Sequence, residues 1–85
     1  MEVGTAIQEE QRELTFGEKA VGLTFNPGGN PEVGIIKRGF ASIIDTMYEM
    51  REHTEDGEVK RMVSIAITEA QTAQMWAVKA LTWKI

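Results

Sequence analysis

The chain of 85 residues is long enough for one small domain, and its 42% hydrophobic and 26% charged residues are typical of a folded protein. Its net charge of −4 argues against nonspecific binding to a nucleic-acid polymer, which depends on many Lys and Arg contacts to phosphates. It has no cysteine, which excludes disulfides, thiol catalysis and cysteine-based zinc sites, and no run of the ~20 apolar residues that a membrane span requires.

Residues 1–14 are predicted to form a short helix or an arm. The segment 5–14, TAIQEEQREL, has a polar helical composition with few apolar members, so we expect a short helix docked on the body. A frayed arm is the alternative. Glu2, Glu9 and Glu10 stand where a secretory signal would need basic and apolar residues, which favours an intracellular protein.

Residues 15–30 are predicted to be a loop, because these sixteen residues contain four glycines and a proline. The segment is too apolar for an idle linker, since it carries Phe16, Val21, Leu23 and Phe25. We expect some of these side chains to pack on the rest of the domain. Phe25, next to the turn, could instead lie against a ligand.

The end of this loop has the features of an anion-binding turn. Asn30 is a favoured helix N-cap, and a helix N-terminus presents unsatisfied N–H groups and a positive dipole end. Gly28 and Gly29 allow close approach to the backbone, and Lys37 and Arg38 add positive charge nearby. A plain surface turn has the same composition and remains the alternative. The sequence is not a Walker loop, because no Gly-Lys-Ser/Thr follows the glycines.

A long helix is predicted over residues 31–53, with Pro31 in the first position. Its apolar stripe repeats at three and four residues and comprises Val33, Ile36, Phe40, Ile43, Ile44, Met47 and Met50. Gly34 and Gly39 weaken this helix by about 1 kcal/mol each relative to alanine, which the close approach of another backbone or a ligand would compensate. The polar run to Gly57 predicts a short turn, so the helices on either side should lie antiparallel.

A second long helix is predicted over residues 58–83. Its heptad-like seam of small residues should meet the first helix or a symmetry mate, and consists of Val59, Val63, Ala66, Ala70, Ala73, Ala77 and Ala80. Met62, Ile65, Trp76 and Trp83 lie on a second face, and Ile67, Val78, Leu81 and Ile85 on a third. A two-helix hairpin has only one partner face to offer, so these further apolar faces predict a homo-oligomer. The fold class is therefore all-α, with a short N-terminal helix and a long antiparallel hairpin in one domain spanning 1–85.

Catalytic and metal-binding constellations are weak. His53 has Glu49, Glu52 and Asp56 near it, which permits a metal site, but charged residues at a helix end are usually only solvated. No serine lies near the histidine in a nucleophile-elbow context, and no carboxylate pair has apolar surroundings that would raise a pKa. We expect neither an enzyme nor a metal or other cofactor.

From Phe16 to Trp83 the chain resembles the small phage hairpin domain shared by anti-CBASS and anti-Thoeris proteins. The resemblance is carried by GLTFNPGGNPEVGIIKR, residues 22–38, and by VKRMVSIAITEAQTAQMWAVKALTW, residues 59–83. It implies a homo-oligomer, a hexamer, that acts in the host cytoplasm as a sponge for cyclic oligonucleotide second messengers. Such a sponge binds its messenger in pockets between subunits and releases it chemically unchanged. Cyclic dinucleotides are the first expected ligands, with cyclic trinucleotides and cyclic ADP-ribose-type signals as further candidates.

The resemblance also implies site residues. In the first pocket Phe25 would stack on a base, Asn26 and Asn30 would hydrogen-bond, and Lys37 would meet a phosphate, while the glycines would give backbone access. Polar and basic residues of the second helix would surround a second pocket. Ile67 stands where some relatives have an arginine, which puts a cyclic trinucleotide site in doubt. The candidate ligand-binding residues are Phe25, Asn26, Gly28, Gly29, Asn30, Lys37, Arg38, Arg61 and Lys79. The alternative function is an oligomeric structural or adaptor hairpin without a small-molecule ligand.

Overall fold

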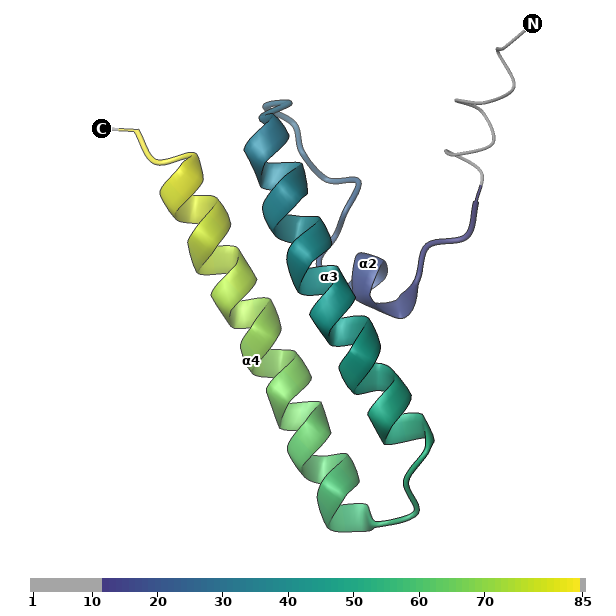
Figure 1. The fold of residues 1–85 in the computed structure, drawn as a ribbon. Coiled ribbons are helices and arrows are strands. Elements are labelled where there is room, and N and C mark those ends of the chain that lie inside the picture. Colours follow the sequence, from purple (N-terminus) through teal and green to yellow (C-terminus); the bar gives the residue numbers. More distant parts are fainter. Residues whose placement is uncertain (1–11, 85) are drawn as a thin grey trace, which may run out of the picture.

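The computed structural model describes residues 12–84, and the regular structure in that part of the chain is entirely helical (Figure 1). It consists of α2 (Phe16–Ala20), α3 (Pro31–Glu52) and α4 (Gly57–Leu81). Figure 1 shows α3 and α4 side by side and antiparallel, with α2 beside the middle of α3. The all-α hairpin expected from the sequence is confirmed. The helix expected over 5–14 falls almost entirely outside the described residues.

Capping side chains set the starts of both long helices. The Asn30 side chain accepts a hydrogen bond from the backbone N–H of Glu32 at 2.8 Å, and Pro31 occupies the first position of α3. At the start of α4 the Asp56 side chain accepts from the N–H of Glu58 at 2.8 Å. Each helix therefore begins where a short polar side chain replaces the missing backbone acceptor.

The expectation that 15–30 is a loop throughout is wrong at its beginning, where α2 forms. Thr15 and Glu18 make a capping box, in which each side chain accepts a hydrogen bond from the other residue's backbone N–H. Gly17 is buried against α3, and a Cβ atom added to it would lie 2.1 Å from the Ala41 carbonyl oxygen. Its N–H donates to Asp45 Oδ1 at 2.6 Å. This glycine is required for close packing, so it does not mark a break in regular structure.

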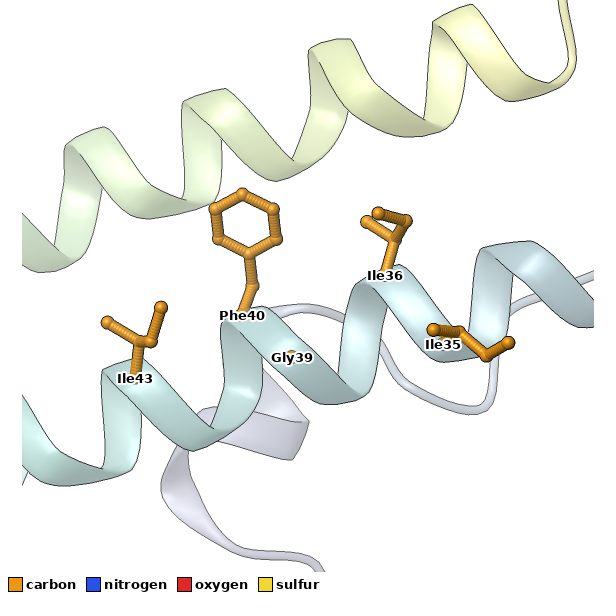
Figure 2. A pocket seen from close by; sticks show the side chains of 5 residues that line it. All are labelled: Ile35, Ile36, Gly39, Phe40 and Ile43. Carbon is orange, nitrogen blue, oxygen red and sulfur yellow. The ribbon is translucent and has the colours of Figure 1, made fainter.

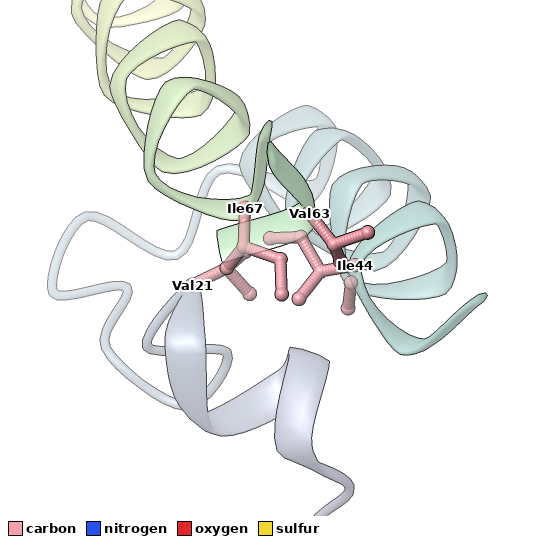
Figure 3. Packing of buried hydrophobic residues seen from close by; sticks show 5 residues of the cluster. Val21, Ile44, Val63 and Ile67 are labelled. Atoms are coloured by element: carbon pink, nitrogen blue, oxygen red, sulfur yellow. The ribbon is translucent and has the colours of Figure 1, made fainter. Parts of the chain in front are cut away.

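The core lies where α2, α3 and α4 meet (Figure 3). Ile44 is fully buried at its centre. Around Ile44 the buried cluster contains Val21, Ala41, Val63 and Ile67. The stripe predicted for α3 is wrong in part, because Ile43 and Met50 are about half exposed, while Lys37 is buried.

The seam predicted for α4 is correct at Val63 and wrong farther along, where Ala73 and Ala80 are exposed and Ile67 and Gln74 are buried. A 3.5-residue seam stays on one side only if the helices supercoil. A straight helix, with 3.6 residues per turn, drifts by about 20° per heptad from that seam. The observed buried positions follow the 3.6-residue period.

Apolar side chains of both long helices remain partly or largely exposed. A shallow cavity of about 250 Å³ on α3 is lined by Ile35, Ile36, Gly39, Phe40 and Ile43. Figure 2 shows Ile36 and Phe40 projecting from α3 on the side where α4 lies. On α4 the exposed apolar residues include Met62, Ile65, Met75 and Trp76. No helix within residues 12–84 has the length and apolar character needed to cross a membrane.

Candidate ligand-binding site

The turn before α3 is closed by its own hydrogen bonds. Asn26 Nδ2 donates to the carbonyl of Asn30 at 2.9 Å, and the N–H of Gly29 donates to the carbonyl of Asn26 at 3.0 Å. Gly29 has a φ of +67°, in the left-handed region that favours glycine. The two asparagines thus shape the turn through hydrogen bonds within the chain.

The N-terminus of α3 offers fewer free donors than the sequence suggested. The N–H of Glu32 bonds the Asn30 side chain, and the N–H of Val33 bonds the Asn30 carbonyl at 3.1 Å. Glu32 also places a negative charge in the first turn. These two amides are therefore satisfied within the chain, and the expected backbone anion cradle is wrong for them.

Lys37 ties the loop to α3. This residue is buried, with 5% of its surface exposed. Its ammonium donates to the carbonyl of Gly22 at 2.9 Å and to the carbonyl of Phe25 at 2.5 Å. An ammonium has three donors, so one proton is left without a protein partner among residues 12–84. The same Nζ atom lies 5.5 Å from the centroid of the Phe25 ring.

Five of the nine predicted site residues line one cavity of about 330 Å³, between the turn, α3 and the end of α4. Phe25 is 71% exposed, so its ring is available for a contact. The predicted residues in this wall are Phe25, Asn26, Gly28, Asn30 and Lys37. The site thus combines an exposed aromatic ring, side-chain amides and one ammonium in a largely apolar wall.

Gly29 and Arg38 lie outside this wall. Gly29 serves the turn through its positive φ, as described above. Arg38 is exposed, and its guanidinium lies over Gly34, where an added Cβ would be 3.3 Å from Arg38 Nη1. Arg38 therefore contributes charge to the surface of α3 and no contact to the cavity.

Arg61 and Lys79 are not brought together within one chain. Arg61 pairs with Glu58, with Nη2 and Oε2 2.5 Å apart, beside a shallow depression that Ser64 and Thr68 also line. Lys79 Nζ lies 5.2 Å and 5.5 Å from ring centroids of Trp76 and Trp83. The two cations are roughly 27 Å apart along α4, at ~1.5 Å per residue. A pocket that uses both would need a second copy.

A second cavity, of about 560 Å³, lies beside the first and is lined by residues of α2, the following loop, α3 and α4. Both cavities are lined by Phe25, Lys37 and Val78. Sequence reasoning missed Gln74 and Val78 of α4, and Thr82 at its C-cap, in these walls. The antiparallel hairpin was the available signal, because it places the end of α4 opposite the start of α3.

Titratable groups form no metal site in the described part of the chain. No group of three or more His, Cys, Asp or Glu side chains there is arranged to hold a metal ion. His53 Nδ1 lies 2.8 Å from the carbonyl of Glu49 and 3.6 Å from its carboxylate.

Away from the cavities, the Arg12 side chain and the Thr15 backbone N–H hold the pKa of Glu18 at about 2, below its ordinary 4.5.

Comparison with known proteins gives one family. Residues 18–82, about three quarters of the chain, match the family model described as "Acb2/Tad1, hairpin domain". The match covers α3, α4, the turn and both cavities. No curated protein and no solved structure matches the chain.

Proposed function

The chain belongs to the Acb2/Tad1 hairpin-domain family of anti-CBASS and anti-Thoeris sponges, and from that membership we propose that it sequesters cyclic oligonucleotide signals without cleaving them. The sponge works by mass action: tight binding by an abundant protein holds the free messenger below the level that activates the host effector. Its ligands are cyclic dinucleotides first, in the cytoplasm of the infected host.

The observation that carries this proposal is the cavity that gathers Phe25, Asn26, Gly28, Asn30 and Lys37. Phe25 offers an exposed ring on which a base can stack. Among residues 12–84, Lys37 donates to two carbonyls, which leaves a third ammonium proton for a ligand beside that ring. A phosphate at this proton would make a charge-assisted hydrogen bond, which is stronger than a neutral one and is strengthened further where water is excluded.

Release of the ligand unchanged is supported by the chemistry of the wall. The lining residues include no carboxylate, imidazole or thiol. Phosphodiester cleavage needs a group that activates the nucleophile and a group that protonates the leaving oxygen. An ammonium, two amides and a hydroxyl favour binding over that chemistry.

Assembly is part of the proposal. Ile35 and Ile43 are 61% and 56% exposed on α3, and Trp76 is 65% exposed on α4. Burying such faces against another copy removes apolar surface from water and so favours assembly. We propose a homo-oligomer, a hexamer as in the family, in which the pocket is completed between subunits.

A simple retention experiment tests this function. The protein is incubated with 3′,3′-cyclic GMP-AMP, separated from free nucleotide, denatured and the supernatant chromatographed. Recovery of intact nucleotide is the expected result. Recovery of an altered nucleotide would assign an enzyme instead. No retained nucleotide would favour a structural or adaptor hairpin, the second candidate, which the exposed Trp76 and Trp83 also suit.

A further inference from the structure

Gln74 is a buried polar side chain with no hydrogen-bond partner among residues 12–84. It lies on α4 with 5% of its surface exposed, and no described residue hydrogen-bonds to its side-chain amide. Gln71, one turn earlier, differs, because its Nε2 donates to the carbonyl of Ala20 at 2.9 Å. Gln74 therefore adds no side-chain hydrogen bond to the fold of residues 12–84, whereas Gln71 does.

The Gln74 side chain borders the larger of the two neighbouring cavities. No side-chain N or O atom among residues 12–84 is both sealed from solvent and unpaired, so the amide keeps some contact with open space. Gln74 lines the 560 Å³ cavity together with Phe25, Lys37 and Val78. It thus faces the same space as the exposed aromatic ring and the ammonium.

The chemistry of a carboxamide identifies what it would bind. Oε1 accepts and Nε2 donates, side by side and in one plane. The edge of a nucleobase presents a donor and an acceptor at the same spacing, which is why Gln pairs with bases in two hydrogen bonds. We propose that Gln74 reads the edge of a base that stacks on Phe25. This inference rests on the proposed function and adds the residue that senses base identity.

The donor and acceptor pattern of this side chain should set base preference. Gln74→Glu replaces the donor with a second acceptor. The Watson–Crick edge of guanine presents two adjacent donors, N1–H and N2–H, which suit a carboxylate. The corresponding edge of adenine pairs its N6–H with the acceptor N1, which a carboxylate repels. Gln74→Glu therefore shifts the preference toward guanine, an effect that loss of folding cannot produce.

Calorimetry with cyclic di-AMP and cyclic di-GMP tests the assignment, using Gln74→Leu, Gln74→Glu and, as a matched control, Gln71→Leu. Gln74→Leu should weaken binding of at least one ligand about tenfold, while the melting temperature stays equal or rises, because no hydrogen bond within residues 12–84 is lost. Gln74→Glu should raise the affinity ratio of cyclic di-GMP to cyclic di-AMP at least about tenfold. Gln71→Leu should lower the melting temperature and leave both affinities within about twofold.

Two results would overturn the role of Gln74 while the sponge function stands. In one, both Gln74 variants bind both ligands as the wild type does. In the other, Gln71→Leu weakens binding as much as Gln74→Leu. Wild-type protein that binds neither ligand, in this assay and in the retention experiment, would remove the proposed function itself and this inference with it.

Discussion

Lys37 belongs both to the fold and to the candidate site. Its ammonium is committed to the carbonyls of Gly22 and Phe25, and so it fixes the position of the aromatic ring at the cavity. Sequence alone predicts a cation near the start of α3 and a cap at Asn30, because both depend on local spacing. It could not predict that Lys37 points inward, since this depends on a loop that folds back over the helix.

Lys37→Ala should weaken cyclic dinucleotide binding at least about tenfold and leave assembly intact. It should also lower the free energy of unfolding by about 2–3 kcal/mol, because the change removes hydrogen bonds from a charged donor and leaves carbonyl groups unpaired. Calorimetry and denaturant unfolding measure the two effects. Arg38→Ala, the neighbouring exposed cation, is the control and should change stability by less than about 0.5 kcal/mol. Unchanged affinity in Lys37→Ala would remove this residue from the site.

The ion pair at α2 predicts a pH dependence of stability. The pKa of Glu18 is about 2 in the folded protein, compared with 4.5 for an unperturbed glutamate side chain. The pKa is lowered because Arg12 and the Thr15 N–H stabilise the carboxylate. The stabilisation is therefore full above about pH 4.5 and is lost as the pH falls toward 2. Solvent screening reduces it to about 1 kcal/mol.

Denaturant unfolding of the wild type and of Glu18→Gln at pH 7 and pH 2.5 measures this contribution. The wild type should be about 1 kcal/mol more stable than the variant at pH 7, and the difference should largely disappear at pH 2.5. A constant difference at both pH values would show that the carboxylate's charge is not the cause.

At the scale of elements, the hairpin was predictable and the packing around it was only partly so. The two long helices carry apolar repeats, caps and a polar turn, all of which are local signals. Helix α2 was missed because glycine is typical of loops, and Gly17 was therefore read as part of one. In the structure Gly17 lets α2 approach the backbone of α3. The buried face of α4 was misplaced because a heptad seam of alanines stays on one side of a helix only if the helix supercoils. The buried positions of α4 instead follow the 3.6-residue period of an ordinary α-helix.

Gly17→Ala should destabilise the protein by at least about 2 kcal/mol, because its Cβ would overlap the Ala41 carbonyl and force α2 off α3. Gly57→Ala is the matched control, since a Cβ there meets no atom within 4 Å. It should be neutral or raise stability by about 0.5 kcal/mol. Chemical denaturation of both variants compares them directly. Equal stability would mean that α2 is not packed on α3 as described.

At the scale of the whole molecule, one hairpin holds the parts of a pocket and leaves it open. The turn, α3 and the end of α4 bring an aromatic ring, amides and an ammonium to neighbouring cavities, while apolar side chains on both long helices remain exposed. Periodicity predicted the exposed face of α4 that carries Met62, Ile65 and Trp76, but it placed the exposed Ile43 and Met50 of α3 in the core. Composition and periodicity could not predict which residues share a cavity, because that depends on the register between α3 and α4.

Native mass spectrometry of the full chain, with and without 3′,3′-cyclic GMP-AMP, is the most direct test of whether an oligomer of this protein sequesters the intact messenger. We predict an oligomer that gains a whole number of nucleotide masses. Each mass should equal that of the intact messenger, and each nucleotide should leave intact when the complex is activated by collision in the spectrometer. A monomer that gains no nucleotide mass, even with the nucleotide in large excess over the protein, would contradict it.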